Sequence, residues 1–236
     1  MAATGLILPF DRSVFGVEER DLLLAVKPHI DVIKIGLEAW TAIDPDTTMS
    51  VGHMVHRFCK NRGVQAFEDW KLHDIPNTVE GAARNIAKRA PAMLTMHASA
   101  GAEAITAVKR ACAPMTKLLV VTVLTSLDDP TCRSIFGADV AHKVVELAKL
   151  GAENGADGIV CSPKELRYLK DAGSTLLTVI PGIRPAQAAI GDQKRVMTPR
   201  EAALEGADYV VCGRPITEAE DPAQAAADIK SELRAA

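Results

Sequence analysis

The sequence predicts an α/β fold, a single-domain (β/α)8 TIM barrel that spans residues 1–236. Three observations lead to this prediction. Short apolar runs recur along the whole chain, each is followed by a segment with helical periodicity, and no Ser/Gly-rich or low-complexity stretch separates them. Barrels of roughly 250 residues are ordinarily built as one domain.

Eight apolar runs are expected to be strands. Several are too continuously apolar to alternate, as parallel strands covered on both faces are. In chain order they are Gly5–Phe10, Val32–Gly36, Gln65–Asp69, Met93–His97, Leu118–Val123, Gly158–Cys161, Leu176–Ile180 and Tyr209–Cys212.

Amphipathic segments rich in Ala, Leu, Glu and Lys are the expected helices, for example Asp139–Asn154 between two strands and Pro222–Leu233 after the last. Helix starts are marked where a capping side chain precedes a proline. These pairs are Ser162-Pro163, Thr198-Pro199 and Asp221-Pro222.

A doubly wound open sheet is the alternative to the barrel, but it usually has a Gly-rich turn after its first strand. Here that turn reads Pro9-Phe10-Asp11-Arg12, which favours the barrel.

The charge balance and the cysteines narrow the class of protein. The chain has 27 Lys and Arg against 30 Asp and Glu, a net charge of −3, which does not suit a nucleic-acid or anionic-membrane partner. Its five cysteines are widely spaced without a Cys-x-x-Cys pair, which favours a reducing cytosol over a zinc cluster or a disulfide framework. The N-terminus lacks a signal-peptide pattern and no apolar run could span a bilayer, so we expect a cytoplasmic protein.

Charged residues gather where the predicted strands end, which is where barrels carry their chemistry. Asp11 follows the first strand and Lys34 interrupts the second. The third strand runs into Asp69 and Lys71. Alternation would put Asp69 and Lys71 on the same side as Phe67, where Lys34 of the neighbouring strand could join them. An ion network without function is the alternative, but such networks stabilise only weakly, so the pattern favours an active site.

A second group of residues is typical of phosphate binding. The loop after the seventh strand begins Pro181-Gly182-Ile183-Arg184 and runs to Arg195, and Gly213 and Arg214 follow the eighth strand. Barrels most often bind phosphate in these two loops, with glycine allowing close backbone approach and arginine offering two parallel donors. A surface arginine beside a turn glycine is the alternative. The length of the first loop predicts a lid.

Other polar residues favour structural roles. His53 and His56 have helical spacing but no third ligand, so they are predicted to lie on a helix face rather than to bind a metal. Cys161 and Cys212 end predicted strands and are expected to be buried as small apolar side chains.

The run from Asp69 to Thr78 resembles the Asp-x-Lys-x-x-Asp-Ile-x-x-Thr signature of orotidine 5'-phosphate decarboxylases. Four later segments resemble motifs of the same family, in the same order, so that the likeness covers nearly the whole chain. They are Val121–Ser126, Pro181–Arg184, Asp192–Pro199 and Gly213–Ile216. The resemblance implies a monofunctional enzyme of pyrimidine biosynthesis that converts orotidine 5'-monophosphate to uridine 5'-monophosphate and carbon dioxide, without a cofactor or a metal.

The resemblance also implies a role for each matching residue. Lys71 would be the general acid that protonates C6 of the pyrimidine, and Asp69 would lie beside the departing carboxylate. Lys34 and Asp74 would complete an array of alternating charges. The enzyme would be a homodimer in which Asp74 and Thr78 enter the partner's site. Substrate would be bound by Asp11 and Lys34 at the ribose, Thr125 and Ser126 at the pyrimidine, and Arg184, Gln193, Gly213 and Arg214 at the phosphate and the lid.

This substrate has no β-keto group to absorb electrons, so stabilisation would have to come from fixed charges aimed at a developing carbanion.

Two other functions share part of this sequence pattern. One is a magnesium-dependent sugar-phosphate barrel enzyme with the same Asp-x-Lys-x-x-Asp sequence, such as a ketogulonate-phosphate decarboxylase or a hexulose-phosphate synthase. The other is a non-catalytic barrel that binds a phosphate ligand, although binding alone does not need a crowded acid–base array.

Overall fold

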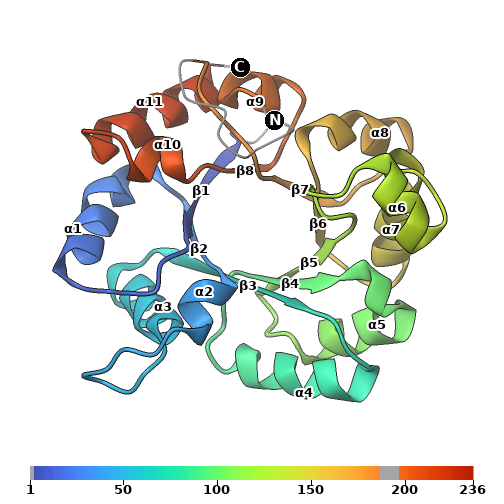
Figure 1. The fold of residues 1–236 in the computed structure, drawn as a ribbon, viewed down its shortest axis with the longest axis horizontal. Coiled ribbons are helices and arrows are strands. Elements are labelled where there is room, and N and C mark those ends of the chain that lie inside the picture. The colour runs from blue at the N-terminus through green and yellow to red at the C-terminus, as the bar shows by residue number, and fades with distance from the viewer. Residues whose placement is uncertain (1–2, 187–196, 236) are drawn as a thin grey trace. The chain divides into compact units, whose positions relative to one another are not determined.

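The computed structural model describes residues 3–186 and 197–235 of the chain. Its eight parallel strands follow one another in chain order as a closed barrel with helices between them, which confirms the predicted fold class (Figure 1). The strands are β1 (Gly5–Phe10), β2 (Val32–Ile35), β3 (Gln65–Leu72), β4 (Met93–His97), β5 (Lys117–Val121), β6 (Gly158–Val160), β7 (Leu177–Ile180) and β8 (Tyr209–Val211).

The helices begin where the sequence marks them. The side chains of Thr198 and Asp221 each accept a hydrogen bond from a backbone N–H three residues on, and Ser162 precedes a short 3-10 turn. The helices are α1 (Val17–Val26), α2 (Leu37–Thr41), α3 (Val51–Arg62), α4 (Pro76–Ala87), α5 (Ala102–Ala111), α6 (Asp129–Phe136), α7 (Val140–Glu153), α8 (Leu166–Asp171), α9 (Pro199–Leu204), α10 (Arg214–Thr217) and α11 (Pro222–Arg234).

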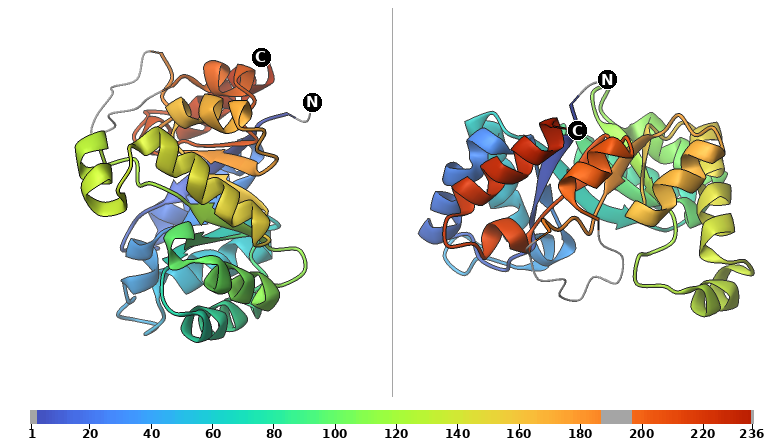
Figure 2. Two further views of the ribbon diagram at one scale, coloured as in Figure 1. Left: turned by 90° about the vertical axis from the view of Figure 1, so that its right-hand side faces the viewer. Right: turned by 90° about the horizontal axis from the view of Figure 1, so that it is seen from above.

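The described chain forms two compact units, one of residues 3–70, 183–186 and 197–235 and one of residues 71–182. In the first unit, β8 pairs with β1, β1 with β2 and β2 with β3, while α11 packs against α1 and α9. In the second unit, β4 to β7 pair in order, and α4, α5, α7 and α8 each pack against the next (Figure 2). That residues 1–236 form one domain stays a prediction.

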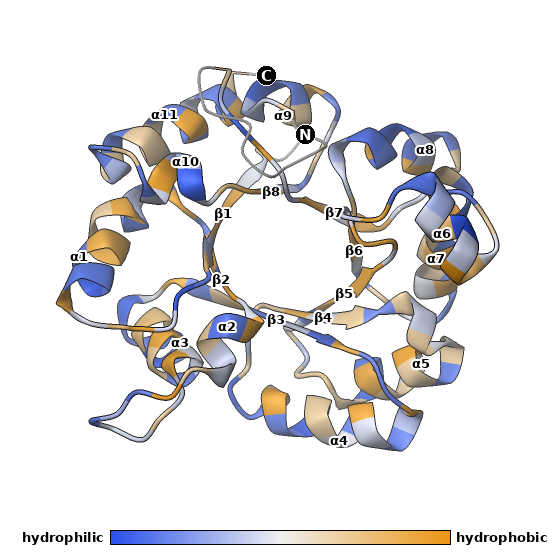
Figure 3. Ribbon diagram, in the orientation of Figure 1, coloured by the Kyte–Doolittle hydropathy of each residue, from blue (hydrophilic) through white to orange (hydrophobic). Residues whose placement is uncertain are grey.

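The strands are buried on both sides, which explains why their sequences do not alternate. In β5, the side chains of Leu118, Leu119 and Val120 are all fully buried, although successive residues of a strand point in opposite directions. Figure 3 shows apolar colours along most of the strands. Among the residues that the structure describes, no helix is long and apolar enough to cross a membrane.

Two strand ends differ from the sequence-based expectation by more than one residue. β3 continues to Leu72, three residues past the predicted end, and β5 stops at Val121, two residues early. The polar run after Asp69 suggested a loop, but the backbone stays in the sheet through these charged residues.

The sheet of the first unit accommodates a proline near the end of its first strand. Pro9 is level with Lys34 of β2, whereas the pairing of β1 with β8 ends at Ile7. Proline has no backbone N–H to donate to a neighbouring strand. Because the pairing with β8 ends before Pro9, the sheet loses no hydrogen bond to β8 at this position. The segment after β8 approaches this proline so closely that a Cβ atom on Gly213 would lie 2.8 Å from Cγ of Pro9.

Candidate active site

The pairing register of the first unit brings a lysine between two carboxylates. Lys34 is level with Pro9 of β1 and Phe67 of β3. Asp11 and Asp69 stand two residues beyond these positions, roughly 6–7 Å further along and on the same side of the sheet. A lysine side chain spans that rise, so Nζ of Lys34 lies 3.1 Å from Oδ1 of Asp11 and 3.2 Å from Oδ2 of Asp69. Of the predicted group of Asp69, Lys71 and Lys34, these contacts join Lys34 to Asp69.

The lysine of this cluster is held in its charged form. The side chain of Lys34 is 14% exposed, that of Asp69 8% and that of Asp11 51%. Burial lowers the pKa of Lys34, but the Asp69 and Asp11 carboxylates outweigh that effect and raise it above its ordinary value of 10.5. The cluster therefore presents one ammonium between two carboxylates at neutral pH.

Gly36, directly after β2, leaves room for this cluster. A Cβ atom there would overlap Oδ1 of Asp11 and lie 3.3 Å from Nζ of Lys34. The φ of Gly36 is −86°, which any residue adopts, so the requirement for glycine is one of space rather than of backbone conformation. Sequence reasoning missed this residue, although a glycine that ends a strand next to a charged residue is the signal that could have found it.

Lys71 has an unusual backbone for a strand residue. Its φ is +51°, in the left-handed region, which costs a non-glycine residue about 1–3 kcal/mol. Its N–H donates a 2.9 Å hydrogen bond to Oγ1 of Thr95, a fully buried residue of β4, and such a bond returns about 1 kcal/mol. Regular alternation of side chains requires an extended backbone, which β3 has as far as Trp70. The left-handed backbone of Lys71 means that alternation does not predict the direction of its side chain. Thr95 is a second residue that the sequence reasoning missed.

The residues after β3 lie at the surface of the second unit. Asp74 is exposed, and its Oδ1 accepts a 2.7 Å hydrogen bond from the N–H of Ile75, which is itself 66% exposed. Thr78 is exposed in the first turn of α4. After β5, Thr125 is half-buried and Ser126 is exposed.

The predicted phosphate-binding residues of the first unit follow β7 and β8. Arg184 is buried, and its Nη1 donates a 2.8 Å hydrogen bond to the carbonyl of Ile183. Arg214 is exposed and begins α10, directly after Gly213. Gln193 and most of the loop predicted to be a lid lie outside the described residues.

The residues predicted to be structural have structural partners. His53 and His56 both lie on α3 but contact different groups: the ring of His53 bonds to Ser50, and Nδ1 of His56 lies 3.1 Å from Oε1 of Glu68. Cys161 and Cys212 are buried as expected. Burial raises the pKa of Cys212 to about 12 and that of Cys161 well above 9.0, so both are neutral thiols.

Glu68 is the third residue that the sequence reasoning missed. Its side chain is fully buried in β3, directly before Asp69, and is bonded on the side away from that residue. The signal was available: a carboxylate inside an apolar strand, alternating with Asp69, needs a partner from the neighbouring helix.

Comparisons with known proteins identify the family of this chain. The model of the Orotidine 5'-phosphate decarboxylase / HUMPS family matches residues 17–229. An orotidine 5'-phosphate decarboxylase of Anaeromyxobacter sp. (strain K) is 46% identical over 211 residues, which are 89% of this chain and 89% of that protein. That of Moorella thermoacetica is 40% identical over 240 residues, covering 94% and 92%. The crystal structure of orotidine 5'-phosphate decarboxylase from Lactobacillus acidophilus matches with a TM-score of 0.79 at 33% identity, covering 98% of this chain and 99% of that one.

Proposed function

Since this chain belongs to the Orotidine 5'-phosphate decarboxylase / HUMPS family, we propose that it converts orotidine 5'-monophosphate to uridine 5'-monophosphate and carbon dioxide in pyrimidine biosynthesis. The observation that carries the proposal is the charged Lys34 between Asp11 and Asp69, at the carboxyl ends of three adjacent strands. Fixed charges of this kind are what a reaction without an electron sink requires.

In the proposed reaction the bond between C6 and the carboxylate breaks, and its electron pair stays on C6. Lys71 donates a proton to C6, so that the ammonium becomes a neutral amine as carbon dioxide leaves. Asp69 lies beside the departing carboxylate, and Lys34 and Asp74 complete the charge array. The left-handed backbone of Lys71, bonded to Thr95, supports this role because strained conformations of this kind gather at active sites.

The remaining residues hold the substrate in this proposal. Asp11 and Lys34 bind the ribose hydroxyls, which suits a half-exposed carboxylate paired with a charged lysine. The pyrimidine contacts come from Thr125 and Ser126, and the phosphate contacts come from Arg184, Gln193, Gly213 and Arg214. Arginine is suited to the last task because its planar group donates two parallel hydrogen bonds to a phosphate.

We further propose that the enzyme is a cytoplasmic homodimer in which Asp74 and Thr78 enter the partner's site. Both side chains are exposed in the single chain, and the neighbouring Ile75 is an exposed apolar residue of the kind that interfaces bury. The cytoplasmic location is in keeping with five cysteines that form no disulfide bond.

One assay tests the proposed function against the magnesium-dependent sugar-phosphate enzymes that share the Asp-x-Lys-x-x-Asp sequence. The purified protein is incubated with orotidine 5'-monophosphate, and the loss of its ultraviolet absorbance is followed before and after exhaustive chelation. We expect equal rates in both conditions, because lysines rather than a metal supply the positive charge. No turnover, or turnover that chelation abolishes and magnesium restores, would contradict the proposal.

A further inference from the structure

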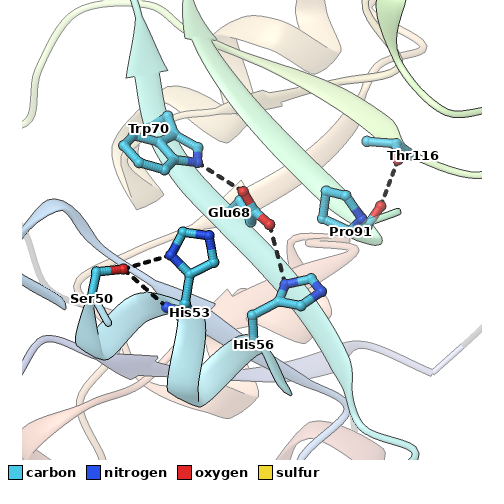
Figure 4. Close-up of polar contacts among 7 residues, drawn as sticks. All are labelled: Ser50, His53, His56, Glu68, Trp70, Pro91 and Thr116. Carbon is cyan, nitrogen blue, oxygen red and sulfur yellow. Dashed lines mark hydrogen bonds and ion pairs between the residues drawn. The ribbon is translucent and has the colours of Figure 1, made fainter. Parts of the chain in front are cut away.

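A buried carboxylate lies on the opposite side of β3 from Asp69. Glu68 is 0% exposed, and Figure 4 shows it between the side chains of Trp70 and His56. Its Oε2 accepts a 2.8 Å hydrogen bond from Nε1 of Trp70, and its Oε1 lies 3.1 Å from Nδ1 of His56. The two carboxylate oxygens thus join the catalytic strand to α3.

Trp70 is also held from its other side. Its ring stacks on that of Trp40 from α2, with centroids 4.7 Å apart and planes 25° apart. The ring of Trp40 contacts the edge of His53, whose backbone N–H and ring are both bonded to Ser50 at the start of α3 (Figure 4). The indole therefore has a defined position set by three elements.

Stability alone does not account for this arrangement. Removing a carboxylate from water costs several kcal/mol, and replacing a whole buried ion pair by apolar side chains of similar volume is often neutral or stabilising. Leucine at position 68 would suit a strand that is otherwise apolar toward its helices.

The arrangement does fix the backbone where the chemistry is proposed. Glu68 and Trp70 are the residues on either side of Asp69, and Trp70 directly precedes Lys71 with its left-handed backbone. Because Glu68 bonds to Trp70 across Asp69, neither neighbour of Asp69 can shift relative to the other without breaking this part-buried hydrogen bond. A displacement of about 1 Å in a reacting group lowers a rate by roughly 100-fold.

We propose that Glu68 is a positioning residue for the decarboxylation: acting through Trp70 and His56, it holds the segment of β3 that carries Asp69 and leads into Lys71. This inference rests on the proposed function. It predicts that replacing Glu68 by an apolar residue lowers kcat while leaving KM nearly unchanged.

Four variants test it. Glu68→Leu removes the hydrogen bond from Trp70 and the contact with His56, and Trp70→Phe removes the indole N–H but keeps an aromatic ring. Glu68→Gln keeps an acceptor for the N–H of Trp70 and leaves a polar group beside Nδ1 of His56. The matched control is Lys109→Met. It removes one of the two donors to Asp157, a carboxylate before β6 whose Oδ2 accepts from Nζ of Lys109 at 2.6 Å and from the N–H of Leu118 at 2.7 Å.

For Glu68→Leu and Trp70→Phe we expect kcat to fall roughly 10- to 100-fold with KM within about threefold of wild type. Glu68→Gln and Lys109→Met should keep kcat within about threefold. Thermal unfolding of each variant shows whether the fold persists, and Glu68→Leu should melt below Glu68→Gln, because leucine leaves the Trp70 N–H without its acceptor. Wild-type kcat in a folded Glu68→Leu or Trp70→Phe protein would overturn the inference, as would a loss in Glu68→Gln equal to that in Glu68→Leu.

A second measurement does not depend on activity, so it separates failure of the inference from failure of the proposed function. The N–H of Lys71 is bonded to Thr95, and its exchange with deuterium reports how firmly this segment is held. In a peptide containing residues 69–72, we expect faster exchange in Glu68→Leu and Trp70→Phe than in wild type, and unchanged exchange in Lys109→Met. Equal exchange in all proteins would refute the positioning role even if the wild-type enzyme had no activity on orotidine 5'-monophosphate.

Discussion

At the scale of single residues, the charge of Lys34 holds together the two carboxylates of the proposed site, Asp11 and Asp69. Its ammonium is the group that the Asp11 and Asp69 carboxylates share, at 3.1 and 3.2 Å. Burial acts against the charge, and the two carboxylates together outweigh it, so the pKa of Lys34 is raised. A neutral side chain at this position would leave the Asp11 and Asp69 carboxylates without the cation that lies between them.

Lys34→Met should therefore lower kcat/KM by roughly 100- to 1,000-fold, the range for loss of one fixed electrostatic group. Steady-state kinetics at neutral pH measure this. Lys117→Met, an exposed lysine at the start of β5, is the control and should keep the wild-type value.

The same substitution has a consequence for stability at high pH. Because the folded-state pKa of Lys34 is raised, its charged form contributes stability that is fully present below 10.5 and is lost as the pH rises through the higher folded-state value. The variant lacks this contribution at every pH. The difference in unfolding free energy between wild type and Lys34→Met should then shrink above about pH 10.5. A difference that stays constant through this range would show that the carboxylates do not stabilise the charge.

At the scale of elements, the register of three parallel strands builds the site, and the turn after β2 keeps it open. Asp11 and Asp69 flank Lys34 because each stands one alternation beyond the residue level with it. Gly36 then allows Asp11 to turn toward the lysine. The strand register brings Asp11, Lys34 and Asp69 to the same side of the sheet, and the absence of a side chain at Gly36 leaves the space in which Asp11 contacts Lys34.

Gly36→Ala should push the Asp11 carboxylate away from Lys34, because the new methyl group would occupy its position. Since Asp11 is proposed to bind the ribose, we expect KM to rise about tenfold, the equivalent of about 1.4 kcal/mol, with a smaller change in kcat. Gly81→Ala in α4 is the matched control, since a Cβ atom there meets nothing within 4 Å. If the substitution acts through Asp11, it should have no further effect in an Asp11→Ala background. An additive loss would contradict this explanation.

The strands and the Lys34 cluster could be predicted from the sequence because both follow from periodicity. Apolar runs mark the strands, and charges at strand ends mark the site. The backbone of Lys71 could not be predicted, because its left-handed conformation depends on a hydroxyl of Thr95, 24 positions away. The space beside Gly36 and the partners of Glu68 likewise depend on how side chains from different elements meet, which periodicity does not specify.

At the scale of the whole molecule, the proposed dimer makes a prediction that a single chain cannot satisfy. Lys71→Ala and Asp74→Ala proteins, each nearly inactive alone, are mixed in equal amounts and allowed to exchange subunits. In a mixed dimer, one site has Lys71 from one chain and Asp74 from the other, and the second site carries both changes. Random exchange makes about half the dimers mixed, so about a quarter of wild-type activity should return.

Mass spectrometry of the mixture shows whether subunits have exchanged. If mixed dimers form and no activity returns, Asp74 acts within its own chain and the shared site is wrong. A mixture of Lys71→Ala with Lys71→Ala/Asp74→Ala is the control, because no pairing of these chains yields a complete site.

The pairing of β1 with β8 also bears on how the protein is made. Gly5 and Ile7 of the first strand lie beside Tyr209 and Val211 of the last, so the partner of β1 leaves the ribosome about 200 residues later. At roughly 5–20 residues per second, that delay is about 10–40 s. Throughout this interval one edge of an almost wholly apolar strand has no partner. The growing chain should therefore depend on a chaperone that covers this edge during synthesis, more than the finished enzyme does.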